Sequence, residues 1–277
     1  SGPTSHQVAD HVKKILNLKK CGHSGTLDPK VTGCLPIAFS KATRIVQYLL
    51  KSNKEYTAIM RLHQQHPEKE IKEIFKKFTG EIKQLPPVRS AVKRQERLRN
   101  IYNLELLEIK DKDVLFNVSC QAGTYIRKLI HDIGKTLNSG ANMTQLVRTK
   151  AGPFTDKTWH NLQELKDAYE FYKQNKNEIQ LRKIILPFEN AISHIPKIWV
   201  LDSAVSNLCH GSYLGANGIS KLQENIKEND TVAITSLKGE LICMGTSKLN
   251  SEQILNSQKG LCATIQKVFM ERKTYPK

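Results

Sequence analysis

The hydrophobic pattern of this chain changes near Pro196, and that change constrains the fold more than any other feature of the sequence. Upstream of Pro196, segments with apolar residues at helical spacing are interspersed with segments in which apolar and polar residues alternate, as in strands. Downstream, short apolar strands are separated by glycines, at residues 198–201, 231–235, 240–244 and 261–265. A chain of 277 residues has room for a large domain and a small one. We therefore predict an α+β domain over residues 1–192 and a small β-rich barrel or sandwich over residues 193–277.

The larger segment contains several elements with clear periodicity. Ser5 is expected to cap a first helix, and the alternating residues 56–62 predict a half-buried strand. A helix is expected between Pro67 and Gly80. Residues 114–120 alternate as a strand, after which Gly123 turns the chain into an amphipathic helix. Together these elements predict an α+β domain.

The charge of the chain points to a polyanionic partner. It has 43 Lys plus Arg against 26 Asp plus Glu, a formal net charge of +17. A hydrophobic content of 39% argues against a wholly disordered basic tail. Phosphate backbones are the commonest partner of such a surface and anionic membranes the second, and charge alone does not separate them.

Several classes of protein are disfavoured by what the sequence lacks. It has no apolar run of membrane-spanning length and no signal-peptide pattern, so an intracellular, soluble protein is expected. Its six cysteines are scattered without a C-x-x-C pair, which disfavours both a zinc site and a disulfide framework. The phosphate-binding, dinucleotide, zinc-protease and hydrolase motifs are missing too, and no metal site is predicted.

Three residues are candidates for chemistry, each with an ordinary alternative. Asp28 lies in residues 21–36, CGHSGTLDPKVTGCLP, where glycines and prolines suit an exposed reactive carboxylate or an ordinary turn. Arg127, in the first turn of the helix after Thr124, is either a carboxylate or phosphate clamp or a surface arginine. Tyr56 is either a stacking platform or a core residue. The basic run 89–99 is either a solvated face or a track for phosphates.

In this order, these segments resemble the motifs of TruB-type pseudouridine synthases, and the dyskerin-like subunit of archaeal H/ACA ribonucleoproteins most of all. The resemblance rests on Gly22-His23-Ser24-Gly25-Thr26-Leu27-Asp28-Pro29, Lys54-Glu55-Tyr56, Pro86-Pro87, Ser90-Ala91-Val92-Lys93-Arg94, Gly123-Thr124-Tyr125-Ile126-Arg127 and Leu146-Val147-Arg148-Thr149. Residues from about 195 onward resemble the PUA domain of that branch. The resemblance thus covers essentially the whole chain, and it implies that the strands of the larger segment form a large mixed, mainly antiparallel sheet flanked by helices.

The resemblance implies isomerisation of uridine to pseudouridine within RNA, without a redox cofactor or metal. Asp28 would be the essential carboxylate, either as a nucleophile or as a base that removes a ribose proton. Arg127 would pair with Asp28 and keep it ionised. Tyr56 would stack on the uracil and could help to remove the C5 proton. Leu146 would form the opposite wall, and His23 could fill the gap that the flipped nucleotide leaves.

The resemblance also implies how RNA is held. Substrate RNA would contact a basic rim, at Lys93, Arg94 and Arg97. The PUA segment would bind the ACA tail of a guide RNA through His210, Gly211, Ser212, Tyr213 and Leu214, although this stretch is also a plausible helix-ending turn. The implied partners are the guide and substrate RNAs and three small proteins: a Nop-type, a Gar-type and a kink-turn-binding ribosomal-like protein. No membrane partner is expected.

The sequence departs from the family pattern at three places. The usual Lys-Pro-x-Gly-x-Thr-Ser opening is replaced by Ser1-Gly2-Pro3-Thr4-Ser5, which suggests a truncated N-terminal edge. The tRNA-gripping insertion of bacterial members is missing after Val92-Lys93, and Val147 replaces an arginine. The alternatives are a stand-alone tRNA pseudouridine synthase and a non-catalytic RNA-binding scaffold. The expected compartment is the cytoplasm for an archaeal source and the nucleolus for a eukaryotic one.

Overall fold

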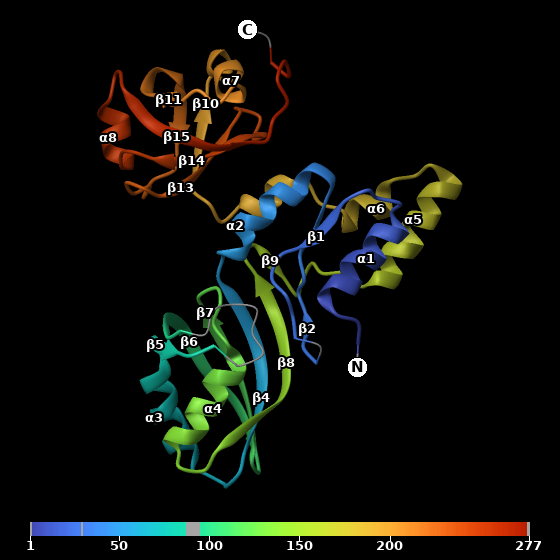
Figure 1. The fold of residues 1–277 in the computed structure, drawn as a ribbon, viewed down its shortest axis with the longest axis vertical. Helices are drawn as coiled ribbons and strands as arrows, with labels where there is room; N and C mark the ends of the chain where they lie inside the picture. Colours follow the sequence, from blue (N-terminus) through green and yellow to red (C-terminus); the bar gives the residue numbers. More distant parts are fainter. Residues whose placement is uncertain (1, 29, 87–94, 276–277) are drawn as a thin grey trace. The chain divides into compact units, whose positions relative to one another are not determined.

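The computed structural model describes residues 2–28, 30–86 and 95–275. They form two compact units, Ser1–Leu186 and Pro187–Lys277 (Figure 1). Both combine helices with one main sheet, so the predicted fold class, an α+β unit with a large mixed, mainly antiparallel sheet followed by a small β-rich unit, is confirmed. The first unit contains Asp28, Tyr56 and Arg127, and the second contains residues 210–214.

A seven-stranded mixed sheet organises the larger unit. Its strands run in the order β2-β8-β4-β7-β6-β5, with β9 on the outer side of β8. The β2–β8 pair is parallel and the other pairs are antiparallel. The bounds are β2 (Thr32–Gly33), β4 (Lys54–Leu62), β5 (Gly80–Gln84), β6 (Arg97–Lys110), β7 (Asp113–Cys120), β8 (Ala141–Ala151) and β9 (Phe154–Thr155).

Helices α3 (Glu68–Phe78) and α4 (Ile126–Thr136) cover one face of this sheet (Figure 1). Phe75 of α3 meets Phe116 of β7 edge-on, with ring centroids 5.4 Å apart, and Leu129 and Ile130 of α4 are fully buried in the same core. The predicted strand over 114–120 and the helix that follows it are both confirmed. Their packing holds α4, and therefore Arg127 in its first turn, over this face of the sheet.

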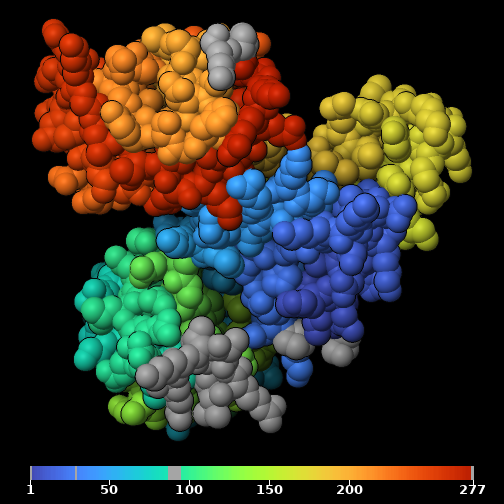
Figure 2. Space-filling model, turned by 45° about the horizontal axis from the view of Figure 1, so that its top comes forward, coloured from blue at the N-terminus to red at the C-terminus, as the bar shows by residue number. Residues whose placement is uncertain are grey.

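The N-terminal segment forms a separate layer. Helix α1 (Ser5–Ile15) packs against α5 (Leu162–Asn175), as Figures 1 and 2 both show, and α6 (Ile179–Ile184) joins their apolar cluster. The prediction that Ser5 caps α1 is wrong. Thr4 is the cap, because its side chain accepts a hydrogen bond from the Gln7 amide at 3.2 Å. Ser5 is buried and free for another role.

A small hairpin and a short helix follow α1. Strand β1 (Cys21–His23) pairs with β3 (Ile37–Phe39), and the chain then enters a 3₁₀ turn (Ser40–Ile45) and α2 (Val46–Leu50). The hairpin brings residues 23 and 37 opposite each other. The loop between β1 and β3, which contains Asp28, is therefore closed at its base.

The smaller unit is a nearly closed, barrel-like sheet of six strands. Their order is β11-β15-β14-β13-β10-β12, with β10 parallel to β13. All four strands predicted there are confirmed, and two more strands and two helices complete the unit. The bounds are β10 (Lys197–Val200), α7 (Asp202–Cys209), β11 (Leu214–Gly215), β12 (Ile219–Leu222), β13 (Thr231–Thr235), β14 (Leu241–Ser247), α8 (Ser251–Asn256) and β15 (Leu261–Val268), with short 3₁₀ turns at Phe188–Ile192 and Ala216–Gly218.

Candidate active site

The loop that carries Asp28 is anchored to the first helix by Ser5. The Leu27 amide donates a hydrogen bond to the Ser5 hydroxyl oxygen at 2.8 Å, and the hydroxyl lies 3.3 Å from the Leu27 carbonyl oxygen. Next to it, the Val31 amide donates to the Asp28 carbonyl oxygen at 2.8 Å. These contacts fix the backbone on both sides of Asp28. The sequence interpretation treated Ser5 as a helix cap and missed this role.

Asp28 and Arg127 come together although they lie on a loop and on α4. The Asp28 Oδ2 atom is 2.8 Å from Arg127 Nη2, and each side chain is 49% exposed. Water therefore still reaches the Asp28 carboxylate. The main effect of Arg127 is to orient this carboxylate, because the arginine does not shield it from solvent. The expected pairing of these two residues is present in the structure.

Gln84, at the end of β5, holds the backbone just before Arg127. The Tyr125 amide donates to Gln84 Oε1 at 3.0 Å, and Gln84 Nε2 donates to the Tyr125 carbonyl oxygen at 3.2 Å. Gln84 is buried, and no side chain caps α4. The start of α4 is thus fixed by a residue 41 positions earlier in the chain, which local sequence patterns do not indicate.

Tyr56 and Leu146 belong to adjacent strands. Tyr56 of β4 is paired with Arg148 of β8, and Leu146 lies two residues before Arg148, so all three side chains project from one face of the sheet. Leu146 is buried in the core cluster, and Tyr56 packs against that cluster. Burial raises the pKa of the Tyr56 hydroxyl to about 12, with a further upward contribution from Cys120. At neutral pH Tyr56 is therefore a protonated phenol.

Lys54 and Glu55, which precede Tyr56, have structural partners. The buried Lys54 ammonium donates to the carbonyl oxygens of Leu49 at 2.8 Å and Leu50 at 3.1 Å, at the end of α2. Burial lowers its pKa to about 8. Glu55 pairs with Lys150 across the strands at 2.9 Å. The Lys-Glu part of this motif thus holds β4 in place beside α2 and β8.

Arg148 is a second arginine at the site, and its function was not foreseen from the sequence. Its side chain is 2% exposed. Nε donates to the Cys34 carbonyl oxygen at 2.7 Å, and Nη2 donates to the Gly25 carbonyl oxygen at 3.0 Å. The Tyr56 hydroxyl is also within its hydrogen-bonding reach. Arg148 therefore contacts both sides of the Asp28 loop and the candidate stacking residue.

His23 lies beside a histidine that sequence reasoning did not consider. His23 Nε2 is 3.4 Å from His6 Nδ1, and the rings meet edge-on. Burial, followed by the nearby His6 and Arg148, lowers the pKa of His23 below its usual value. The imidazole is accordingly neutral at neutral pH, which suits a group that is to stack among bases.

The predicted basic rim is described only in part, because Lys93 and Arg94 lie outside the described residues. Arg97 and Arg99 begin β6 and point to the same side of the strand, and both are partly buried. The Nε atom of each is buried without a hydrogen-bond partner. A Cβ atom at Gly123 would come within 3.1 Å of the Arg99 guanidinium, so Arg99 lies over the turn that leads into α4.

Residues 210–214 of the smaller unit connect the end of α7 to the start of β11. The Gly211 and Ser212 amides donate to the Leu208 and Asn207 carbonyl oxygens, and Gly211 has φ +88°, the pattern of a glycine-terminated helix. His210 Nδ1 lies 2.7 Å from the Ser206 carbonyl oxygen. Leu214 is buried, whereas Tyr213 is 65% exposed. Tyr213 thus presents an exposed aromatic ring that RNA can reach.

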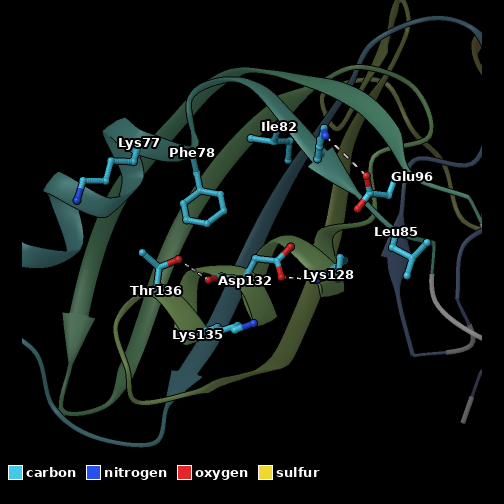
Figure 3. Close-up of a pocket in the computed structure, with 10 residues that line it drawn as sticks. Lys77, Phe78, Ile82, Leu85, Glu96, Lys128, Asp132, Lys135 and Thr136 are labelled. Atoms are coloured by element: carbon cyan, nitrogen blue, oxygen red, sulfur yellow. Dashed lines mark hydrogen bonds and ion pairs between the residues drawn. The ribbon is translucent and has the colours of Figure 1, made fainter.

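A shallow hollow of about 410 Å³ lies between α3, β5 and α4 (Figure 3). Its lining includes Lys77, Phe78, Lys83, Glu96, Lys128 and Asp132. Lys128 pairs with Asp132, and Lys83 lies 3.7 Å from Glu96, so part of its positive charge is neutralised. None of the predicted site residues lines it.

Two further classes of feature are missing from residues 2–28, 30–86 and 95–275. No group of three His, Cys, Asp or Glu side chains there is placed to hold a metal ion. No helix within these same ranges is long and apolar enough to span a bilayer.

Family models match nearly the whole chain. The N-terminal domain of TruB family pseudouridylate synthases matches residues 13–126, the C-terminal domain of tRNA pseudouridylate synthase B matches 127–193, and the PUA domain matches 196–269. Curated relatives belong to the same family and align with the whole of this chain. The "Probable tRNA pseudouridine synthase B" of Pyrococcus furiosus is 52% identical over 277 residues, covering 100% of this chain and 82% of that protein. The chain therefore belongs to the TruB family of RNA pseudouridine synthases.

Solved structures place it more closely within the family. A chain of the "Crystal Structure of a Cbf5-Nop10-Gar1 Complex" superposes with a TM-score of 0.95 at 52% identity, covering 100% of this chain and 84% of the other. A chain of the "Structure of H/ACA RNP bound to a substrate RNA containing 2'-deoxyuridine" gives 0.92 at 49% identity, covering 99% and 84%. The protein of Methanosarcina barkeri with the same curated name as the Pyrococcus relative is 49% identical over 276 residues, covering 100% of this chain and 82% of that protein.

Proposed function

We propose that this chain isomerises uridine to pseudouridine in RNA, as the catalytic subunit of an H/ACA guide ribonucleoprotein. One observation carries the proposal: the Asp28 carboxylate is oriented by Arg127 at 2.8 Å, on a loop whose backbone is held on both sides. The reaction breaks the N1–C1′ bond, forms a C5–C1′ bond, releases the C5 proton and leaves a proton on N1. It is therefore balanced without a cofactor.

Asp28 is the group that starts the reaction. Its carboxylate acts either as a nucleophile on the nucleotide or as the base that removes a ribose proton, and both roles require an ionised, accessible oxygen. Half exposure leaves the carboxylate accessible, and the guanidinium 2.8 Å away orients it. Arg127 holds the carboxylate in one orientation, so that it faces the flipped nucleotide.

Tyr56, Leu146 and His23 hold the nucleotide. The base must leave its stack to reach Asp28, and an aromatic ring compensates for the lost stacking by about 1–3 kcal/mol per base. We assign Tyr56 as the stacking platform and Leu146 as the apolar wall, because both project from one face of the sheet. The neutral His23 imidazole fills the position that the nucleotide leaves.

The hydroxyl of Tyr56 has a more restricted role. A phenol with a pKa of about 12 takes up a proton only after it has first lost its own. We therefore assign the final C5 proton to solvent or to Asp28 and the Tyr56 ring to stacking. The Tyr56 hydroxyl serves as a hydrogen-bonding group toward Arg148 and the base.

RNA is held by regions on both units. Substrate RNA lies along Arg97, a partly buried arginine at the start of β6, and the basic residues 93–94. In the domain division that we propose, residues 1–192 are catalytic and residues 193–277 are a PUA domain that binds the guide. Residues 210–214 would contact its ACA tail, with Tyr213 as an exposed aromatic side chain and Leu214 buried in the core of the unit.

The matched structures support the choice of partners: one is a Cbf5-Nop10-Gar1 complex, and another is an H/ACA RNP bound to a substrate RNA. We propose that a Nop-type, a Gar-type and a kink-turn-binding protein assemble with this chain on the guide. The relatives named here come from Pyrococcus and Methanosarcina, so we place its activity in the cytoplasm of an archaeal cell.

A second activity is favoured by the names of the relatives from Pyrococcus and Methanosarcina, both called "Probable tRNA pseudouridine synthase B". The chain would then modify tRNA without a guide. One assay separates the two activities: tritium release from RNA labelled at uracil C5, with the chain alone on tRNA and with the chain, guide and partner proteins on a guide-matched target. We expect guide-dependent release in the second format. Equal release from tRNA by the chain alone would instead favour the second activity.

A further inference from the structure

Arg148 is a buried arginine without a carboxylate partner among the described residues. Its side chain is 2% exposed, and none of the ion pairs formed within the described ranges includes it. A buried guanidinium is costly unless its donors are satisfied. Here the donors are used by main-chain oxygens of one loop and by the phenol of Tyr56. The buried guanidinium of Arg148 is thus used to hold the loop backbone and the Tyr56 hydroxyl.

The contacts of Arg148 lie on both sides of Asp28. Gly25, three residues before Asp28, accepts from Nη2, and Cys34, six residues after it, accepts from Nε. The Cys34 amide also donates to the Arg148 carbonyl oxygen at 2.7 Å. One side chain therefore sets the span of the loop and ties it to β8, the strand that pairs with Tyr56.

We propose that Arg148 is a positioning residue for the isomerisation, which holds the Asp28 loop and Tyr56 in one fixed arrangement. The inference rests on the proposed function for its kinetic consequence. Arg148 does not react: it acts through Asp28, which reacts, and through Tyr56, which stacks on the base. A displacement of about 1 Å in a reacting group can cost on the order of 10²-fold in rate.

The requirement is for arginine rather than for positive charge. A guanidinium presents several donors in one rigid plane, so it can hold two carbonyl oxygens and a hydroxyl at once. Lysine has a single ammonium group on a flexible chain, so it cannot reproduce this planar arrangement of donors. The neighbouring Val147 pairs with Thr32 and Thr57 and points to the opposite face of β8. The Val147 departure therefore does not affect the Arg148 contacts.

The test compares Arg148→Lys and Arg148→Met with the control Arg61→Lys. Arg61 lies on the same sheet and is bidentate to Asp113, with distances of 2.9 and 2.6 Å, but its side chain is 60% exposed. In the assembled ribonucleoprotein, we expect Arg148→Lys to slow single-turnover tritium release by about 10²-fold. The dissociation constant for RNA should change less than about threefold, and Arg61→Lys should match the parent.

A second measurement does not depend on catalysis. Hydrogen exchange of the loop amides, such as those of Leu27, Val31 and Cys34, reports directly on how firmly the loop is held. We expect faster exchange in Arg148→Lys than in the parent and no change in Arg61→Lys. Unchanged exchange in Arg148→Lys would overturn the inference, even if the parent proved inactive and the proposed function failed. A loss of RNA affinity equal to the loss of rate would overturn it as well. If Arg148→Met does not fold, the lysine variant decides.

Discussion

The ion pair between Asp28 and Arg127 decides where the candidate nucleophile or base points. At 2.8 Å and half exposure, such a pair contributes only about 0–1 kcal/mol to folding. Its value lies in orientation, because the carboxylate is on a loop and the guanidinium is on a helix that packs in the core. Stability and activity should therefore respond very differently to its removal.

Arg127→Ala should leave the fold intact and remove most of the activity. We expect the unfolding free energy to fall by no more than about 1 kcal/mol and tritium release to fall by at least about 10²-fold. Thermal denaturation and the release assay on the same preparation check both values. Loss of folding together with activity would instead show that Arg127 is a structural residue.

Tyr56 yields a prediction about pH. Its pKa is raised to about 12, so the phenol stays protonated throughout pH 7–9. We expect tritium release by the parent to show no titration of Tyr56 in that range, and Tyr56→Phe to be slower with the same profile. A parental rate that rises tenfold per pH unit and becomes flat in Tyr56→Phe would identify a phenolate base and contradict the stacking role.

At the scale of elements, the parallel pairing of β2 with β8 closes the Asp28 loop. Gly33 lies opposite Arg148 at φ +109°, and a Cβ atom there would come within 2.3 Å of the Arg148 carbonyl oxygen. No other residue type fits this position without a backbone shift. Gly80 has a similar φ of +100°, but a Cβ atom added there would meet no other atom within 4 Å. A comparison of the two glycines therefore separates the cost of the backbone conformation from the cost of a steric clash.

Gly33→Ala should be far more damaging than Gly80→Ala. Both variants bear a left-handed backbone cost of about 1–2 kcal/mol, but only Gly33→Ala must also push β2 away from β8. For Gly80→Ala we predict a loss of stability equal to this backbone cost and normal tritium release. For Gly33→Ala we predict that tritium release falls by at least about 10²-fold. Equal activities in the two variants would show that the β2–β8 pairing does not position Asp28.

Elements with strong periodicity could be predicted from the sequence, whereas pairings between distant segments could not. The alternation of residues 114–120 and the apolar stripe of α4 gave both elements with nearly correct bounds. Strand β6 was read only as a basic run because it starts with Arg97 and Arg99 and its pairing with β7 shifts register twice. Strand β8 was overlooked because its pattern is interrupted by partly exposed polar residues.

The site follows the same rule. Asp28, Tyr56 and Arg127 were identified from motifs, and the structure brings Asp28 and Arg127 together. Ser5, Gln84 and Arg148 were missed as supports, since each acts through main-chain atoms that are 22, 41 and 114 or more residues away. A hydrogen bond to a backbone atom places no demand on the identity of its partner, so it leaves no pattern in a single sequence.

At the scale of the whole molecule, the positive charge is unevenly divided. Residues 187–277 contain ten Lys or Arg and eight Asp or Glu, a net charge of +2, which leaves +15 of the total +17 for residues 1–186. The larger unit should therefore provide most of the salt-dependent attraction for RNA.

This distribution predicts how RNA binding responds to salt. In plots of log affinity against log salt concentration, Arg97→Gln should reduce the slope by about 0.7–0.9, the contribution of one phosphate contact. The control is Lys248→Gln, an exposed lysine of the smaller unit, for which we expect the parental slope. Filter binding at several salt concentrations measures both slopes. A reversed order would place the main phosphate contacts on the smaller unit.

The most direct test of the account is the chemistry of Asp28. Asp28→Asn keeps the shape of the side chain and removes its charge, so the loop anchored by Ser5 and Arg148 should persist. Single-turnover tritium release from C5-labelled RNA, in the presence of guide and partner proteins, should fall by about 10³-fold or more while RNA affinity is retained. Release by Asp28→Asn at the parental rate would contradict the central claim that this carboxylate carries the isomerisation.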